Sequence, residues 1–450
     1  MVQPFELTVT QAASEIRVGR LSPVELLQSL LDRIDALEPS LQAWATLVPE
    51  QALEAARRAE QEMRSYGPRS VMHGIPFGAK DIFDTAGIRT AAGSKIWADR
   101  VPDADAASVA YLKSAGGVLL GKTHTTEFAD GDPAPSRNPW NAAHTAGGSS
   151  TGSGVAVAAR MVPAAFGSQT VGSVLRPASY NGVVGLKPTF GRISRRGVIP
   201  MAFSFDHVGL LVRSVEDAAA LLGLLAGRDA DDPESSHEPV GDYLATLVQP
   251  RTTARFGLVR GWFSAESDAE TRLRTEEVAQ ELAKAGAEIV EVDPGIDFGL
   301  AYERHRVMQE AEMAQWHEPL YTGNEHLYGP KISVYLQNGL SHSATRYVAA
   351  AAYRRVVQRL AKATLENVDV LLMPTTSAPA PADLTQTGDT RFQSPWSYTG
   401  FPSISIPMGL AGNGMPLGLQ MVCGPFDEAK LLSVARWAEQ ALGIELNPPV

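Results

Sequence analysis

The residues between Ala146 and Gly191 have the types that nucleophilic chemistry uses. Glycine, serine and threonine are concentrated there, and apolar residues such as Val155 and Val157 are interleaved, so a flexible linker is not expected. Glycine-rich turns beside helix starts let backbone N–H groups approach an anion closely. Two uses fit this pattern. One is phosphate binding, and the other is stabilisation of the oxyanion that forms when a serine attacks a carbonyl carbon.

Two known motifs help to separate these uses. The phosphate-binding sequence G-x-x-x-x-G-K-[ST] does not occur within the stretch, so a nucleotide site there has little support. Residues 148–152 formally match G-x-S-x-G, the nucleophile elbow of α/β-hydrolases. That elbow needs a strand directly before it, whereas residues 136–148 contain Pro and Asn and are typical of a loop. Acyl transfer by a different arrangement of residues is therefore favoured.

The same stretch strongly resembles the amidase signature family, whose motif runs Gly-Gly-Ser-Ser, then Gly-Ser ahead of the nucleophile, then Gly-Leu-Lys-Pro-Thr. Other matching segments extend over nearly the whole chain and lie at 74–76, 80–81, 93–94, 121–123 with Glu127, 138–141, 374–376, 400–402, 416–420, and Glu428 with 431–432. The resemblance implies one α/β domain over residues 1–450. Its core would be a mixed, mostly parallel β-sheet covered by helices on both faces.

The resemblance also implies a catalytic set of Ser173, Ser149 and Lys80. Ser149 is the first serine of the Gly-Gly-Ser-Ser run, and its separation of 24 positions from Ser173 matches the family. In the family, the peptide bond that enters the position of Ser149 is cis. Ser173 would be the nucleophile, Lys80 the final base, and Ser149 the group that passes the proton between them. A lysine can act so only when burial and hydrogen bonds lower its pKa from about 10.4.

The turn before the nucleophile is expected to form the oxyanion hole. Its donors would be the backbone N–H groups of Thr170, Val171, Gly172 and Ser173. The scheme uses neither a metal nor an organic cofactor. Side chains expected to contact the substrate are Ser150, Phe128, Asp130, Trp396 and Tyr398.

Two departures from the family surround Ser173. The common form has Asp where this chain has Gln169, and its arginine stands one position before Arg176. We expect a charge pair of the common form to be replaced here by a neutral contact from Gln169 to the turn after Ser173. Val171 replaces a glycine, so its φ is expected to be negative. The sequence leaves open what these changes do to the oxyanion turn.

The activity that the resemblance implies is hydrolysis of the C–N bond of a small-molecule amide, or of a urea or hydrazide, through an acyl-serine intermediate. The bonds would be those of linear amides rather than peptide bonds, with water as second reactant. One alternative is the glutaminase component of a tRNA-dependent amidotransferase, against which Arg176 argues because those proteins often have Gln there. Another is a non-catalytic binding protein, which intact Ser173, Ser149 and Lys80 disfavour. The sequence leaves the substrate open, as well as the need for a partner protein.

Composition narrows the classes of partner. The chain of 450 residues has a formal net charge of −11 and no visible basic stripe, so nucleic-acid binding is not expected. No apolar run reaches the roughly 18 residues of a membrane span, and no leader marks the chain for secretion, so the expected location is the cytoplasm. The only cysteine, Cys423, excludes an intrachain disulfide. A homodimer is expected from the family alone.

Hydrophobic periodicity predicts the elements that must position these residues. Helices are expected over 7–65, with Ser22 as an N-cap and Pro23 at the first helical position. The signature core, about 70–215, alternates short apolar runs with glycine, which favours an α/β sheet. Strands are expected at 118–122, 183–186, 256–259, 287–292, 368–373, 403–406 and 418–422. Helices are expected at 268–285, 299–315, 343–366 and 427–442, and a polar loop at 228–252.

Overall fold

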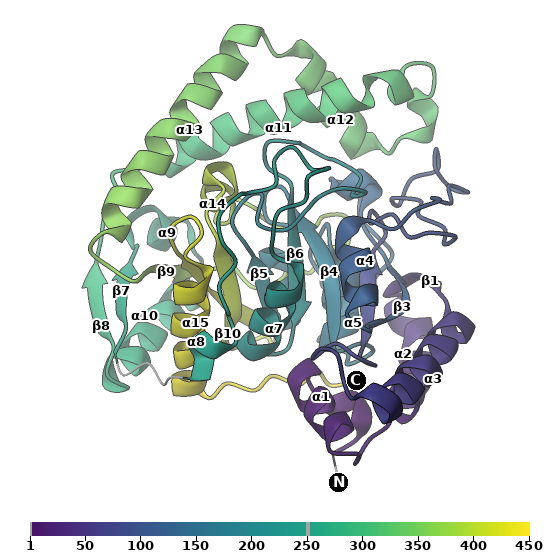
Figure 1. The fold of residues 1–450 in the computed structure, drawn as a ribbon. Coiled ribbons are helices and arrows are strands. Elements are labelled where there is room, and N and C mark those ends of the chain that lie inside the picture. The colour runs from purple at the N-terminus through teal and green to yellow at the C-terminus, as the bar shows by residue number, and fades with distance from the viewer. Residues whose placement is uncertain (1, 249–252) are drawn as a thin grey trace.

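The core of the structure, a computed structural model that describes residues 2–248 and 253–450, is an eleven-stranded β-sheet (Figure 1). Its strands lie in the order β1-β3-β2-β4-β6-β5-β10-β11-β9-β7-β8. Their bounds are β1 Trp44–Leu47, β2 Pro76–Lys80, β3 Val118–Thr123, β4 Ala164–Gln169, β5 Val184–Lys187, β6 His207–Val212, β7 Arg255–Leu258, β8 Glu288–Glu291, β9 Val370–Pro374, β10 Ser403–Leu410 and β11 Pro416–Val422.

Antiparallel pairs outnumber parallel ones in this mixed sheet. Parallel pairing joins β2 to β3 and β4, and joins β7 to β8 and β9. The six other neighbouring pairs are antiparallel. A mixed sheet is confirmed, whereas the expectation of a mostly parallel one is wrong. The connections give a physical reason, because the short link at 411–415 between β10 and β11 can join antiparallel strands but not parallel ones.

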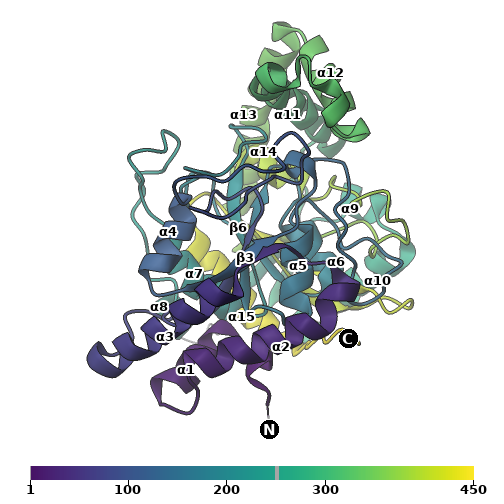
Figure 2. The same cartoon turned by 90° about the vertical axis from the view of Figure 1, so that its right-hand side faces the viewer.

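Helices cover both faces of the sheet, as the resemblance implied. Helices α5 and α6 pack on one face, and α4, α7 and α15 pack on the other (Figure 2). The α-helices have the bounds α1 Val9–Arg17, α2 Pro23–Leu41, α3 Pro49–Tyr66, α4 Ala107–Ser114, α5 Thr151–Ala158, α6 Leu175–Asn181, α7 Val215–Leu225, α8 Ala245–Val248, α9 Gly261–Glu266, α10 Ala269–Lys284, α11 Phe298–Tyr321, α12 Pro330–Ser341, α13 Ala344–Leu365, α14 Ser394–Thr399 and α15 Glu428–Leu442. Three short 3-10 helices are η1 Pro4–Glu6, η2 Glu127–Ala129 and η3 Glu325–Leu327.

The N-terminal segment is helical with one exception. Ser22 caps α2 as expected, because its hydroxyl accepts a hydrogen bond from the backbone N–H of Glu25 at 3.0 Å. The expectation of helix throughout 7–65 misses β1, which pairs with the edge of β3. A four-residue strand is stabilised by its partner strand and not by its own sequence pattern, so periodicity does not reveal it. The predicted loop at 228–252 contains α8, and its last four residues lie outside the described part of the chain.

Helices α11, α12 and α13 form a separate layer above one end of the sheet (Figure 1). Helix α12 was not expected from the sequence. It packs closely against α11, and both helices contribute side chains to the cavity described below. Within the described residues, no helix is long and apolar enough to cross a lipid bilayer.

Candidate active site

Lys80, Ser149 and Ser173 are brought together by the ends of neighbouring elements. Lys80 is the last residue of β2, Ser149 stands just before α5, and Ser173 lies in the turn between β4 and α6. Because β2 and β4 are parallel neighbours, their carboxyl ends meet at the same edge of the sheet. Binding sites of α/β sheets commonly lie outside the carboxyl ends of parallel strands.

The amino group of Lys80 is buried and held by two hydroxyl groups. Its Nζ donates to Ser149 Oγ at 2.6 Å and to Ser168 Oγ at 2.8 Å, and the residue is 0% exposed. Burial moves the pKa of Lys80 well below its ordinary value, and the charge of Arg176 lowers this pKa further while that of Asp206 raises it in part. These surroundings favour the neutral amine, which can accept a proton.

Ser149 and Ser173 line the same cavity, which has a volume of about 170 Å³. The Gly148–Ser149 peptide bond is cis, as the resemblance implied. Ser173 is only 8% exposed, so it is a buried residue of the cavity wall. Other parts of the wall come from α11, α12 and the loop at 387–390.

The turn before Ser173 presents unused backbone donors. Among the described residues, the N–H groups of Val171, Gly172 and Ser173 have no protein acceptor. A Cβ at Gly172 would lie 2.4 Å from Oε1 of Gln393, so a larger residue there would displace the end of that side chain. The φ of Val171 is not positive, in line with the expectation. The backbone N–H of Thr170 likewise has no protein acceptor among the described residues, and its hydroxyl donates to the buried carboxylate of Asp206 at 2.6 Å.

The side chain of Gln169 supports this turn through hydrogen bonds. Its Oε1 accepts hydrogen bonds from the backbone N–H groups of Val174 and Leu175, each at 2.9 Å. Its Nε2 donates to Ser397 Oγ at 3.0 Å, and that hydroxyl donates to the carbonyl of Val171 at 2.7 Å. The predicted neutral contact from Gln169 to the turn after Ser173 is therefore confirmed.

Of the side chains expected to contact the substrate, Asp130 lines the cavity. Its Oδ2 is buried and has no hydrogen-bond partner among the described residues. Burial raises the pKa of Asp130 to about 7, and the charges of Asp132 and Glu310 raise it as well, whereas Arg306 lowers it. An unpartnered carboxyl oxygen can accept a hydrogen bond from a ligand, or donate one when protonated.

The structure does not place the four other expected contacts at this cavity. Ser150 is fully buried, and its hydroxyl exchanges hydrogen bonds with the backbone of Ser168. Phe128 belongs to a cluster of aromatic rings beneath α11. Trp396 and Tyr398 are core side chains with 0% exposure. Aromatic residues fill cores as readily as pockets, so their presence in the sequence did not distinguish the two.

Two other buried lysines could be mistaken for the catalytic base in the sequence, but the structure gives them different hydrogen-bond partners. Lys122 donates to Asp81, to Thr90 and to the carbonyl of Phe83, and Lys187 donates to backbone carbonyls. Among the described residues, neither lysine donates to Ser149 or Ser173, whereas Lys80 donates to Ser149 Oγ. Residues 116–123 also fit G-x-x-x-x-G-K-[ST], but their last six residues form β3, so no phosphate-binding loop follows from that match.

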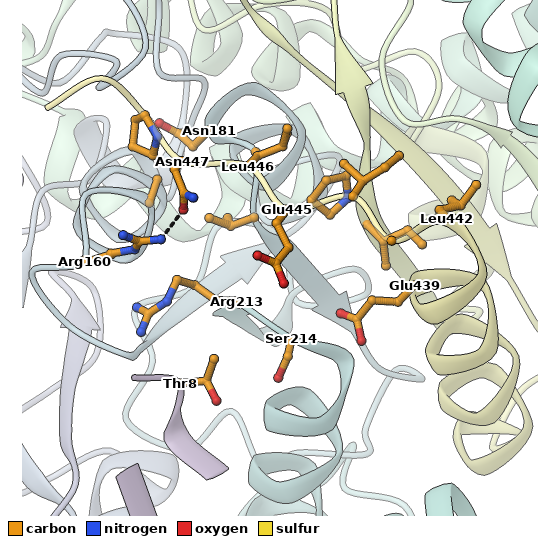
Figure 3. A pocket seen from close by; sticks show the side chains of 18 of the residues that line it. Thr8, Arg160, Asn181, Arg213, Ser214, Glu439, Leu442, Glu445, Leu446 and Asn447 are labelled. Atoms are coloured by element: carbon orange, nitrogen blue, oxygen red, sulfur yellow. Dashed lines mark hydrogen bonds between the residues drawn. The ribbon is translucent and has the colours of Figure 1, made fainter. Parts of the chain in front are cut away.

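A larger cavity of about 410 Å³ lies beneath the C-terminal segment (Figure 3). Its two hydroxyl residues from helix starts are already engaged, because Thr8 caps α1 and Ser214 caps α7. Of the charged side chains in it, Arg213 donates to the carbonyl of Leu7 and Glu439 accepts from the backbone N–H of Val215. It holds no serine next to a buried base, so the smaller cavity is the better candidate for the chemistry.

Sequence reasoning missed the side chains that α11 and α12 bring to the cavity. These are Tyr302, Arg306, Gln309 and Tyr335. No local pattern marks them, because they reach the site only through the packing of these helices over the sheet. Ser168, the second partner of Lys80, could have been found, since it lies in the same Gly-Ser motif as the nucleophile.

Comparisons with known proteins agree with this geometry. The sequence model of the family described as Amidase matches residues 25–432. The chain is 36% identical to the A-type subunit of glutamyl-tRNA(Gln) amidotransferase from Geobacter sp. (strain M21), with 96% of each chain covered. It matches a structure from a vestigial protein complex that reveals the evolutionary origins of an s-triazine catabolic enzyme, with a TM-score of 0.92, 30% identity and 99% and 100% of the two chains covered. The native peptide amidase from Stenotrophomonas maltophilia gives a TM-score of 0.86 at 32% identity, with 98% of both chains covered. The chain therefore belongs to the amidase signature family.

Proposed function

We propose that the protein hydrolyses the C–N bond of a small-molecule amide, or of a related urea or hydrazide, with Ser173 as nucleophile. One observation carries this proposal. Lys80 is wholly buried and donates to Ser149 Oγ at 2.6 Å, beside a cavity that Ser149 and Ser173 both line. A serine hydroxyl is a poor nucleophile unless a nearby group accepts its proton.

In the proposed reaction, Ser173 Oγ attacks the carbonyl carbon while its proton passes through Ser149 to neutral Lys80. The free N–H groups of the turn at 171–173 stabilise the oxyanion of the tetrahedral intermediate. The C–N bond then breaks, and the amine leaves with the proton returned through Ser149. Water adds to the resulting ester of Ser173, which releases the carboxylic acid and restores the hydroxyl.

The test is a panel of linear amides, ureas, hydrazides and glutamine, with released amine or ammonia read by mass spectrometry. We expect turnover of some members by the wild type and a loss of about 10³-fold or more in Ser173→Ala. Ser108→Ala is a matched control, because Ser108 is a buried serine of α4 whose hydroxyl has no partner among the described residues. Turnover that persists in Ser173→Ala would place the nucleophile elsewhere.

The glutaminase component of a tRNA-dependent amidotransferase is the second candidate function. The amidotransferase relatives at 36% identity favour it, whereas Arg176 argues against it. Ammonia release from glutamine only after addition of a copurifying partner would support this function. Turnover of other amides by the isolated chain would support the first. A homodimer and a cytoplasmic location stay predictions.

A further inference from the structure

We infer that Arg176 recognises a carboxylate on the substrate, so that the substrates are short amides that carry a free carboxylate. The inference rests on the proposed function and adds a substrate class to the same site. Arg176 stands three positions after Ser173, in the first turn of α6, and lines the cavity with Ser173 and Ser149.

Three hydrogen bonds fix the guanidinium of Arg176. Nε and Nη2 donate to the carbonyl of Gly148 at 3.2 and 2.6 Å, and Nη1 donates to the carbonyl of Gly388. A guanidinium carries five N–H groups, so Nη1 and Nη2 each keep one N–H. Since the residue is only 4% exposed, these two groups depend on the cavity for an acceptor. Each of these two N–H groups can donate to an oxygen of a carboxylate.

The positive charge of Arg176 has no carboxylate partner among the ion pairs of the described residues. The other arginine of the cavity, Arg306, is paired with Glu310 at 2.7 Å. Asp389, which also lines the cavity, is paired with Arg391 at 2.8 Å. Two of the four charged residues in the wall are thus neutralised, while the charge of Arg176 is not. A buried charge without a counter-ion is unfavourable, and an anionic ligand would supply the counter-ion that Arg176 lacks among the described residues.

The fourth charged residue, Asp130, neutralises the positive charge of Arg176 only in part. Burial raises the pKa of this carboxyl to about 7, with Asp132 and Glu310 adding to the rise and Arg306 opposing it. Below pH 7 it is mainly neutral, and the cavity then has a net positive wall. We therefore expect the preference for a carboxylate to be strongest in mildly acidic solution.

A purely structural role is the rival explanation. Arg176 supports the carbonyl of Gly148 and helps to keep Lys80 neutral, so its loss could slow every reaction. Such a role lowers turnover of charged and neutral substrates by the same factor. Recognition of a carboxylate changes their ratio, and the ratio is therefore the readout.

The experiment compares pairs of compounds that differ in charge but hardly in size. Malonamate, succinamate and glutaramate are matched with the neutral malonamide, succinamide and glutaramide, and N-acetylglycine with N-acetylglycinamide. We expect kcat/KM of the wild type to favour the charged member of at least one pair by about 10- to 100-fold. The preference should fall to about 1 in Arg176→Gln and be partly restored in Arg176→Lys. Arg306→Gln should keep most of it, because Glu310 already neutralises Arg306.

Equal turnover of charged and neutral members by the wild type would overturn the inference and leave amide hydrolysis intact. A preference lost in Arg306→Gln but kept in Arg176→Gln would overturn it too. Where no compound is turned over, calorimetry of succinamate and succinamide with Ser173→Ala replaces the kinetic ratio. Tighter binding of succinamate that depends on Arg176 supports the inference, and equal affinity refutes it. Turnover that persists in Ser173→Ala contradicts the proposed function separately.

Discussion

Replacing Gln169 by alanine removes the side chain that supports the turn around Ser173. In the wild type, Oε1 of Gln169 is the acceptor for the backbone N–H groups of Val174 and Leu175, each at 2.9 Å. Its Nε2 also orients Ser397, whose hydroxyl holds the carbonyl of Val171. All of these groups are buried, so the variant leaves buried donors without an acceptor.

The loss in the free energy of unfolding of Gln169→Ala follows from these contacts. A buried donor left unsatisfied costs about 1–3 kcal/mol, and two are left in Gln169→Ala. A water molecule that enters the vacated space would return part of this, so we expect the free energy of unfolding to fall by about 2–4 kcal/mol. Ser397→Ala removes one hydroxyl and should cost less, about 1–2 kcal/mol. Both variants should lower kcat, because the donors for the oxyanion lie in the turn that they support.

The assay is urea denaturation at pH 7, together with kcat and KM on any substrate found in the panel. Gln61→Ala is the control, since Gln61 lies on the exposed face of α3 and should shift stability by no more than about 0.5 kcal/mol. A loss of stability in Gln169→Ala no larger than in Gln61→Ala, with kcat unchanged, would refute the view that Gln169 holds the turn.

Three other predictions follow from buried ionisable groups. Lys80→Met should lower kcat by about 10²–10⁴-fold with the circular dichroism spectrum unchanged, and near-normal turnover of this variant would exclude Lys80 as the base. In the wild type, kcat should fall as the pH falls through the lowered pKa of Lys80. Because burial raises the pKa of Asp130 to about 7, its ionisation opposes folding, so its contribution to stability is complete below about pH 4 and lost as the pH rises through 7. The Tm of Asp130→Asn relative to wild type should therefore rise from pH 4 to pH 8, and a constant difference would contradict this reasoning. Lys122→Met leaves the buried carboxylate of Asp81 without its cation at 3.3 Å and should cost about 3–5 kcal/mol in urea denaturation; a loss below about 1 kcal/mol would show that the pair is unimportant.

Features that depend on neighbouring residues could be predicted from the sequence. The run of glycine and serine from 146 to 173 indicated the nucleophile segment, because its chemistry and its tight turns are encoded within a short length of chain. Ser22 and Pro23 predicted the start of α2 for the same reason, since an N-cap acts on the helix directly after it. Apolar runs predicted β3 and β9, which are buried along their whole length.

Features that depend on distant contacts could not be predicted in this way. Lys80 is an ordinary lysine in the sequence, and only the fold buries it and brings it to Ser149, 69 positions along the chain. Strand β1 exists because β3 offers it an edge, and the antiparallel majority of the sheet follows from the path of the chain. Trp396 and Tyr398 matched the composition of a binding site but fill the core.

The types and spacing of Ser149, Ser173 and their neighbours were thus enough to indicate the chemistry and the similarity to a family. The fold was needed to show which residues line one cavity, that Lys80 is buried away from water, and that Arg176 has no ion-pair partner among the described residues. The physical reason is that pKa values and unpaired charges depend on every group within a few ångströms. At this site α6, α11 and α12 line the cavity, while β2 and β4 supply Lys80 and Ser168 behind it, and only the folded chain brings these elements together.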